Sequence, residues 1–563
     1  MSDHDDRATV GITLTVARPA EALTLDALHA LSSGTLARWL PEQRWFGAKG
    51  TTVAAARVLD LVLLPPAATA DPAVAGVALA RLEVELADGR VERYQLPLVV
   101  RGADDQPRGA IARVAVDGQP DAAPDAAPDA APDAAPDAAP DDGPAAAWWL
   151  SDGATDPELG RRLGAAFAAG LTQGDENATW RFAVEAGADA DVAPLATEPP
   201  TAASGEQSNS SIRFGKRAIL KLYRRLEAGE HPDVEVTRYL TRVRNFAYTP
   251  PLLGVLRVED ARGASVVTGM LQALVPHARD AWTEAVKQAR AYIGAPGEGE
   301  PDNPFADDIH WLGEITRDMH DALAVEREDV AFTPADADVD DVAGWVERAR
   351  REAFDTLDLL AARRAEDAIP GAAAAIADAV LRRRAEVVTD LDDFAGAIGG
   401  RPGIRIRHHG DFHLGQVLRD AEGTYWIIDF EGEPARLLAE RRARTSALRD
   451  VAGMLRSFAY AAATAAAEVG GVGTNGLVEQ RLARWERAAR DAFLDGYLFA
   501  PDADPALLPE DPDARDRLLA LFETEKVFYE LAYELNNRPS WAWIPLRGIG
   551  RLLGSPRNGP APR

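Results

Sequence analysis

Two aspartates in the second half of the chain have the spacing of a catalytic base and a metal ligand. Asp411 lies in the run HGDFHLGQ, residues 409–416, and Asp429 follows the apolar run 426–428. A positioned carboxylate can accept a hydroxyl proton, and carboxylate and amide oxygens are ligands that Mg²⁺ prefers. Asp411 and Gln416 are five residues apart, as are the base and the metal-binding amide in a kinase catalytic loop. We therefore predict that Asp411 is a catalytic base and that Gln416 and Asp429 hold magnesium.

Two histidines flank the predicted base. His409 and His413 could in principle bind zinc. We expect them instead to orient the loop through hydrogen bonds.

A loop of small and hydroxyl residues, GEQSNSS at 205–211, precedes an apolar run that reads as a strand. Backbone N–H groups and hydroxyls in such a loop can contact phosphate oxygens. This predicts that Ser208, Asn209 and Ser210 bind the phosphates of ATP, although the loop matches neither a GxGxxG fingerprint nor a Walker A motif.

Lys221 lies within the apolar run AILKLY, where an unpaired ammonium would be costly to bury. Fourteen residues later, Glu235 lies in a helix-like stretch that opens with Pro232 and Asp233. A pair between Lys221 and Glu235 would be the ion pair that positions the α- and β-phosphates in kinases.

The elements that must position these residues divide the chain into a strand-rich first half and a helix-rich second half. Alternating apolar positions predict strands around residues 82–98, 213–223 and 264–274, with helices at 25–40 and 156–170. From residue 280 onward the pattern is mostly helical, with strands at 404–407 and 424–428. The order predicts an α+β fold with two lobes, which is bilobal and protein-kinase-like.

The amino-acid composition indicates which classes of binding partner and which kinds of site the protein lacks. The chain has 563 residues, a formal net charge of −28 and no cysteine. The charge argues against nucleic acid or a membrane as the main partner, and the lack of cysteine excludes disulfides and thiolate metal sites. The sequence starts MSDHDDR, without the pattern of a signal peptide, so we expect a cytoplasmic protein. Only 5 of the 61 Lys and Arg residues are Lys, which makes each Lys worth inspection.

Several runs of this sequence resemble those of the actinobacterial maltokinases. The runs HHGDFHLGQVLR, WIIDFEGEP and ERRARTSALRDVAGMLRSFAY carry the resemblance, together with QRWFGAKG at 43–50 and YELAYELNNRPSW at 529–541. The resemblance implies an aminoglycoside-phosphotransferase-like fold with an N-terminal cap subdomain at 1–117. It further implies an intermediate subdomain at 145–275 and a helical lobe at 276–563. Between them, residues 118–144 hold five PDAA units, which we interpret as a disordered insertion.

Membership of that family would make the chain an enzyme that uses ATP and Mg²⁺ to phosphorylate the anomeric hydroxyl of maltose. The product, maltose 1-phosphate, would feed glycogen and other α-glucans, in association with trehalose synthase. We would expect a monomer or a weak dimer. The expected sugar-binding residues are His413, Glu431, Arg441, Tyr529, Tyr533, Asn537, Arg538 and Trp541.

Three alternatives remain open. The chain could phosphorylate another sugar, such as glucosamine, on the same scaffold, or modify an aminoglycoside. It could also be a non-catalytic scaffold of glucan metabolism, although the intact Lys221, Asp411, Gln416 and Asp429 argue against that reading.

Overall fold

The protein is built from two compact units. The computed structural model describes residues 12–32, 34–117, 147–203, 208–297, 299–325, 330–387, 389, 391, 402–434, 436–470 and 476–554. Residues 1–234 and 251–274 form the first unit, and residues 235–250 and 275–563 form the second. The PDAA insertion predicted at 118–144 lies outside the described residues.

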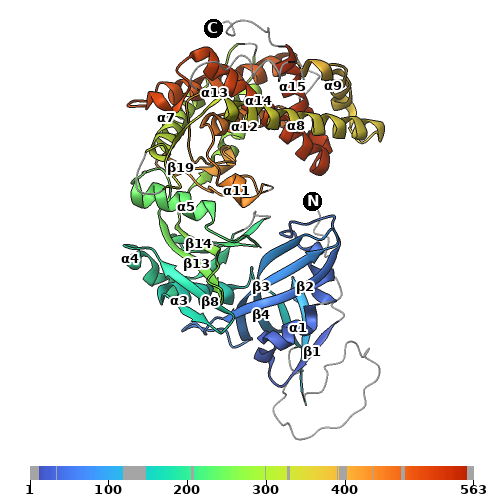
Figure 1. The fold of residues 1–563 in the computed structure, drawn as a ribbon, viewed down its shortest axis with the longest axis vertical. Helices are drawn as coiled ribbons and strands as arrows, with labels where there is room; N and C mark the ends of the chain where they lie inside the picture. Colours follow the sequence, from blue (N-terminus) through green and yellow to red (C-terminus); the bar gives the residue numbers. More distant parts are fainter. Residues whose placement is uncertain are drawn as a thin grey trace. The chain divides into compact units, whose positions relative to one another are not determined.

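Two seven-stranded sheets dominate the first unit (Figure 1). One has the order β1-β5-β6-β4-β3-β2 with β12 beside β4, and the other has the order β7-β8-β13-β14-β11-β10-β9. The strands of the first sheet are β1 (Thr13–Val16), β2 (Val53–Leu63), β3 (Val74–Leu86), β4 (Val91–Ala103), β5 (Ala110–Val116), β6 (Ala147–Asp152) and β12 (Arg225–Leu226). Those of the second are β7 (Thr172–Gly174), β8 (Ala178–Val184), β9 (Pro200–Ala202), β10 (Asn209–Phe214), β11 (Ala218–Tyr223), β13 (Leu252–Asp260) and β14 (Ser265–Ala273).

Strand β3 shows why the first sheet is apolar on both faces. Ala78, Ala80 and Leu82 enter one core, whereas Val77 and Leu79 enter another that includes residues of the second sheet. Because successive side chains point to opposite faces, a strand covered on both sides reads as a continuous apolar run. The strands predicted around residues 82–98 are confirmed by the antiparallel pairing of β3 with β4.

Short helices complete the first unit: α1 (Leu25–Ser32), α2 (Thr35–Trp39), α3 (Pro157–Ala168) and α4 (Asp189–Val192). Residues 25–40, predicted as one helix, form α1 and α2 because Gly34 leaves the helical conformation between them. Helix α3 begins where expected, since the Asp156 side chain accepts a hydrogen bond from the Glu158 backbone N–H.

An ion pair joins the two sheets of the first unit. Asp152, the last residue of β6, accepts two hydrogen bonds of 2.9 Å from Arg224, which follows β11 and is 1% exposed. Trp45 donates to the same carboxylate at 3.1 Å and lies 4.6 Å beneath the Arg224 guanidinium. Arg224 also donates to the Ser210 hydroxyl on β10 at 2.8 Å. The QRWFGAKG segment is therefore linked to the strand that carries the predicted phosphate-binding residues.

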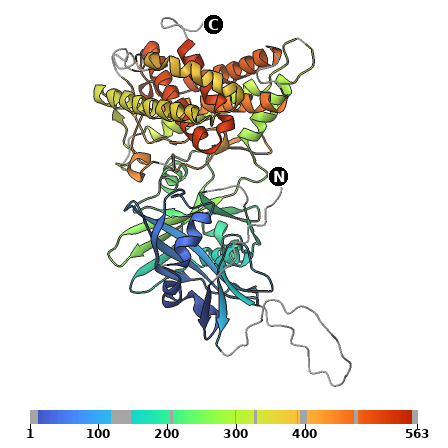
Figure 2. The same ribbon diagram turned by 90° about the vertical axis from the view of Figure 1, so that its right-hand side faces the viewer.

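The second unit is mainly helical (Figures 1 and 2). Its helices are α6 (Ala281–Ile293), α7 (Phe305–Leu323), α8 (Val339–Ala365), α9 (Gly371–Arg382), α11 (Leu438–Arg441), α12 (Leu448–Glu468), α13 (Gly476–Leu498), α14 (Pro512–Asn537) and α15 (Trp543–Gly554), and α5 (Pro232–Arg238) spans the boundary between the units. Its short strands are β15 (Arg279–Asp280), β16 (Ala335–Asp336), β17 (Ile404–Arg405), β18 (Val417–Arg419) and β19 (Tyr425–Ile427).

Helix α12 is the centre of this unit. Nearly all of its first five turns are buried, and it packs against α6, α13, α14 and α15. Its many alanines allow neighbours to approach from several sides, while its N-terminal turn places the buried Asp450 beneath residues 408–410. The mixed α+β fold is confirmed in these two units.

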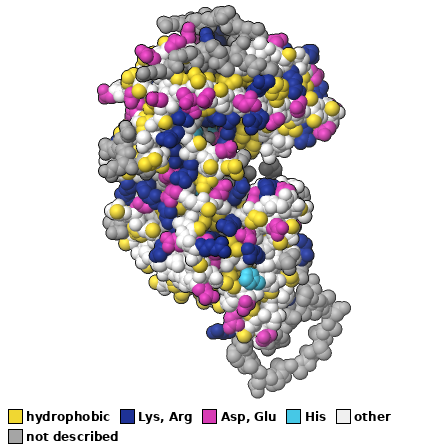
Figure 3. Space-filling model, in the orientation of Figure 1, with side chains coloured by type: hydrophobic (Ala, Val, Ile, Leu, Met, Phe, Trp, Pro, Cys, Tyr) yellow, Lys and Arg dark blue, Asp and Glu magenta, His cyan; other side chains and the backbone are white. Residues whose placement is uncertain are grey.

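Acidic and basic side chains are interspersed over the face of the molecule drawn in Figure 3, so the negative charge is not gathered into one acidic face there. Across the described part of the chain, no helix combines the length and apolar character needed to cross a bilayer.

The Asp152–Arg224 pair yields a stability prediction. Asp152→Ala would leave the Arg224 guanidinium buried without its carboxylate, which typically costs about 3–5 kcal/mol. We expect the free energy of unfolding of the first unit to fall by that amount in urea denaturation followed by tryptophan fluorescence. Asp88→Ala is the control, since Asp88 and its partner Arg90 are about half exposed and should leave stability unchanged. Equal effects of the two substitutions would contradict the role assigned to the pair.

Candidate active site

One buried carboxylate fixes the backbone of the predicted catalytic loop. Asp450 is 1% exposed and accepts hydrogen bonds from the backbone N–H groups of His409 at 2.7 Å and Gly410 at 2.9 Å. His320, on α7, contributes a third contact at 3.1 Å through Nε2, and its Nδ1 lies 2.9 Å from the Tyr497 hydroxyl. Burial opposes the charge of Asp450, but the neighbouring histidines and these hydrogen bonds outweigh it and hold its pKa well below the usual range.

His409 links the catalytic loop to the strand that precedes Asp429. Its Nε2 lies 2.9 Å from the carbonyl oxygen of Ile428, which can only accept, so this nitrogen carries the proton. The other ring nitrogen then accepts the Asp411 backbone N–H at 3.4 Å. The ring packs between Phe412 and Phe430, at centroid distances of 5.1 and 4.9 Å. His409 therefore has the orienting role that the sequence predicted.

The two predicted magnesium ligands come from neighbouring segments. Gln416 ends the short turn at Leu414–Gln416, and its backbone carbonyl accepts from the N–H of Ile428, one residue before Asp429, at 3.0 Å. Asp429 has a φ of 70°, a left-handed conformation that residues other than glycine adopt mainly at specialised positions. Half-buried carboxylate and amide groups on adjoining segments suit Mg²⁺, which typically takes one or two carboxylates and completes its shell with phosphates and water.

The loop after Asp429 approaches the catalytic loop without side chains between them. Gly410 has a φ of 87°, and a Cβ added to it would lie 3.1 Å from the Cα of Gly432. Gly432 also has a positive φ, of 71°. The positive φ angles favour glycine at both positions, and the absence of a Cβ at Gly410 allows the two loops to approach closely.

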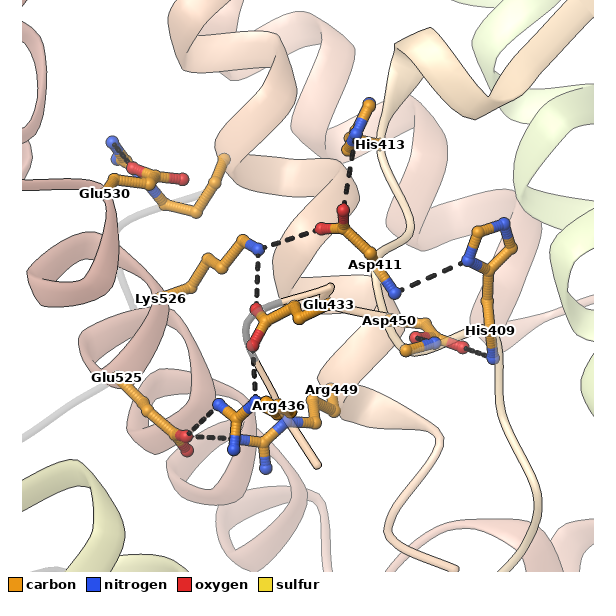
Figure 4. Close-up of polar contacts among 12 residues, drawn as sticks. His409, Asp411, His413, Glu433, Arg436, Arg449, Asp450, Glu525, Lys526 and Glu530 are labelled. Carbon is orange, nitrogen blue, oxygen red and sulfur yellow. Dashed lines mark hydrogen bonds and ion pairs between the residues drawn. The ribbon is translucent and has the colours of Figure 1, made fainter. Parts of the chain in front are cut away.

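Asp411 lies in a cavity with a lysine that comes from α14 (Figure 4). Its Oδ1 is 3.2 Å from Lys526 Nζ, which donates a second hydrogen bond of 3.0 Å to Glu433. The same ammonium lies 4.8 Å from the centre of the Tyr529 ring. Burial opposes the charge of Lys526, but Glu433 and Asp411 outweigh it and raise its pKa above the usual value.

The charges continue in strict alternation beyond Glu433. Arg436 donates to both Glu433 and Glu525, and Glu525 also pairs with Arg449. Figure 4 shows this series running from Asp411 through the ammonium of Lys526 to the guanidinium groups. Burial raises the pKa of Glu433, but Lys526 and Arg436 lower it further, to about 2.

The predicted sugar-binding residues fall into two groups. Tyr529 lines the Asp411 cavity, and His413 Nε2 lies 3.9 Å from Asp411 Oδ2 while its Nδ1 accepts the Gly415 N–H at 3.0 Å. Burial lowers the pKa of the His413 ring beside Asp411. The Glu431 backbone carbonyl accepts from Arg441 at 3.0 Å, which fixes the loop that precedes α11.

The remaining four predicted sugar contacts lie farther along α14 and just after it. Tyr533 is 46% exposed, and the Arg538 guanidinium lies 5.5 Å from its ring and 5.0 Å from that of Trp541. Arg538 also pairs with Glu534. Asn537 turns back on its own helix, where its amide donates to the Tyr533 carbonyl at 2.9 Å. The structure thus groups Tyr533, Arg538 and Trp541 as an aromatic surface, separate from the cavity residues.

The predicted nucleotide residues belong to the first unit. Ser208 is exposed, Asn209 is buried at the start of β10, and the Ser210 hydroxyl accepts from Arg224. Residues 205–207 of the predicted loop lie outside the described residues. Lys221, paired across the strands with Ser211, lies 3.3 Å from Asp233, which also accepts from the Tyr223 hydroxyl.

Glu235 belongs to the second unit, where Arg407 donates to it at 2.8 Å and Arg442 donates at 2.7 and 3.0 Å. The Lys221–Glu235 pair therefore stays a prediction. Asp233, which the sequence indicated only as a helix-start residue, is an acidic neighbour of Lys221.

Sequence reasoning missed Lys526, Asp450 and Glu525. The scarcity of lysine could have indicated Lys526 as a candidate site residue, because the chain has only five lysines. Asp450 lies in the run ERRARTSALRDVAGMLRSFAY, which resembles the maltokinases, but its role depends on a contact with a segment some 40 residues earlier.

Known proteins resemble this chain in both units. Residues 39–137 match the family description "Maltokinase N-terminal cap domain". A glucosamine kinase from Streptacidiphilus jiangxiensis is 32% identical over 351 residues, which cover 62% of this chain and 72% of that enzyme. The chain belongs to this family of cap-bearing sugar kinases. A glucosamine kinase from Mycolicibacterium smegmatis is 28% identical over 356 residues, or 62% of this chain and 78% of that enzyme.

Solved structures of the family share its fold. A glucosamine kinase in complex with glucosamine, ADP and inorganic phosphate superimposes with a TM-score of 0.56 at 22% identity, over 92% of this chain and 100% of that one. Another crystal form of a glucosamine kinase superimposes with a TM-score of 0.57, also at 22% identity. This superposition covers 93% of this chain and 99% of that one. The predicted α+β fold of a capped, kinase-like enzyme is thereby confirmed for this sugar kinase family member.

The anchoring of the catalytic loop gives one prediction. Asp450→Asn removes the buried charge that accepts the two loop N–H groups, and hydrogen bonds to charged groups are worth about 1.5–3 kcal/mol each. We expect urea denaturation to show a loss of about 2–3 kcal/mol in unfolding free energy. Asp260→Asn is a matched control, since Asp260 also accepts two backbone N–H groups but on an exposed turn, and it should have a much smaller effect.

Glu433 gives a pH prediction. The pKa of Glu433 is about 2 in the folded protein, below the ordinary value of 4.5. The stability that its ionised carboxylate contributes is therefore complete above about pH 5. This stability declines at lower pH, because Glu433 takes up a proton in the unfolded chain before it does so in the folded protein. Between pH 7 and pH 3 this loss amounts to about 2 kcal/mol. The stability difference between the wild-type protein and Glu433→Gln should therefore shrink by that amount over the same range, measured by urea denaturation. A difference that stays constant with pH would contradict the assignment.

Proposed function

We propose that this protein uses ATP to phosphorylate the anomeric hydroxyl of maltose, giving maltose 1-phosphate. The observation that carries the proposal is the position of Asp411. It lies on a loop anchored by Asp450 and His409, with its carboxylate turned into a cavity lined by Lys526 and Tyr529. Such an arrangement suits a base that accepts a proton from a hydroxyl that it also positions.

In this mechanism the acceptor hydroxyl donates its hydrogen bond to Asp411, which takes the proton as the phosphoryl group is transferred. Lys526 keeps the Asp411 carboxylate oriented through its 3.2 Å contact and can also donate to a sugar oxygen. Asp429 and Gln416 would hold Mg²⁺, which neutralises phosphate charge when bound. In the first unit, Lys221 and the residues at the start of β10 would contact the ATP phosphates.

Two observations favour a neutral sugar such as maltose as the acceptor. The cap residues match the maltokinase description, and the carboxylates around Asp411 are already paired with cations. Tyr529 and the aromatic surface of Tyr533 and Trp541 offer faces on which the C–H surfaces of sugar rings can stack. The product, maltose 1-phosphate, would feed α-glucan synthesis in the cytoplasm, in association with trehalose synthase.

Glucosamine is the second candidate acceptor, because both of the relatives described above are glucosamine kinases. Incubation with ATP, magnesium and a panel of free sugars, followed by phosphorus NMR, separates the candidates. An anomeric phosphate on maltose is the expected result, whereas a 6-phosphate on glucosamine would overturn the choice of maltose.

Asp411→Asn tests the proposed base. We expect turnover to fall at least about 10²-fold, equivalent to roughly 2.7 kcal/mol of activation free energy, because the amide cannot take the proton. Turnover is measured by a coupled ADP assay after the variant is shown to be folded by circular dichroism. Asp367→Asn, at a side chain that is 97% exposed, should retain full activity. A folded Asp411→Asn protein with normal turnover would remove Asp411 from the mechanism.

A further inference from the structure

Lys526 is held in one place from three sides. Its ammonium lies between the carboxylates of Asp411 and Glu433, at 3.2 and 3.0 Å, and over the ring of Tyr529 at 4.8 Å. The side chain is only 19% exposed. A lysine restrained in this way acts as a fixed positive charge and not as a mobile surface group.

The described carboxylates around the cavity all have partners without any ligand. Asp411, Glu433 and Glu525 each contact at least one of the cations Lys526, Arg436 and Arg449. The fourth carboxylate, Asp450, accepts from the backbone N–H groups of His409 and Gly410 and contacts His320. An acceptor with a charged amine would therefore add a positive charge that no carboxylate in the cluster is left to neutralise. A neutral sugar adds none, and its hydroxyl oxygens can accept hydrogen bonds from Lys526.

The stereochemistry of an amino sugar brings its charge close to this lysine. The 2-amino group is on the carbon next to the anomeric carbon. When the anomeric hydroxyl donates to Asp411, the amine lies within a few ångströms of that carboxylate, and Lys526 Nζ is 3.2 Å from the same group. Two ammonium ions about 5 Å apart in a partly buried site repel strongly enough to change affinity by at least about tenfold.

We propose that Lys526 is a specificity-determining residue that excludes 2-amino sugars and selects neutral sugars at the Asp411 cavity. The proposal rests on the proposed function, because it assumes that the anomeric hydroxyl is presented to Asp411. The Lys526 ammonium would repel the charged amine of an amino sugar. Such repulsion discriminates against the amino sugar without any new contact to the neutral sugar.

The test compares glucose with glucosamine, which differ only in the 2-substituent. Binding of each sugar is measured by calorimetry at pH 6.5, in the presence of a non-hydrolysable ATP analogue and Mg²⁺, for the wild-type protein, Lys526→Met and Lys526→Arg. We expect the wild-type protein to bind glucose at least about tenfold more tightly than glucosamine. Lys526→Met should reduce this preference at least about tenfold, and Lys526→Arg should restore it, because the arginine keeps the charge.

The proposal is overturned if the wild-type protein binds glucosamine as tightly as glucose, or binds neither. It is also overturned if Lys526→Met lowers the affinity for glucose and for glucosamine by the same factor, which would indicate a merely structural role. Because binding is measured without phosphoryl transfer, a failure to phosphorylate maltose in the NMR assay counts against the proposed function independently of these outcomes.

Discussion

The geometry of the candidate active site depends on a buried negative charge that points at the backbone of the catalytic loop. Asp450, at the start of the most buried helix of the second unit, accepts the N–H groups of His409 and Gly410. A buried carboxylate is stable only if its hydrogen-bonding capacity is satisfied, so the loop and the helix constrain each other. His409 then extends the constraint to Ile428, and hence to the segment that carries Asp429. The proposed base and the proposed metal-binding residues are thus positioned by one continuous set of hydrogen bonds.

The pairing of charges around Lys526 follows from the same physical limit. Six charged side chains with little exposure lie close together, and a net charge there would be costly to desolvate. The charges therefore alternate in sign along the series Asp411, Lys526, Glu433, Arg436, Glu525 and Arg449. Asp411, the proposed base, contacts one cation of this series, Lys526. Pairing of this kind also keeps the lysine charged, which is the basis of the selectivity that we infer.

Much of this architecture could be predicted from the sequence, because its signals are local. Strand alternation located β3 and β4, and the spacing of Asp411, Gln416 and Asp429 placed them on adjoining segments, as the Ile428–Gln416 hydrogen bond shows. Long-range contacts could not be read in the same way. Lys526 is 115 residues from Asp411 along the chain, and no periodicity predicts their meeting. Helical spacing placed Tyr529, Tyr533 and Asn537 on one face, but it could not show that Tyr529 lines the cavity while Asn537 bonds to its own helix.

The alternating charges have a consequence for how the site can change over evolutionary time. Replacing any one member by a neutral residue leaves its neighbour unbalanced, so losing a cation and a carboxylate together costs less stability than losing one of them. Substitutions in this series are therefore expected to be correlated among descendants of a common ancestor, with Lys526 and Glu433 exchanged as a pair. A single substitution at Lys526 would change the preferred acceptor at a cost in stability, and a compensating change at Glu433 would recover it.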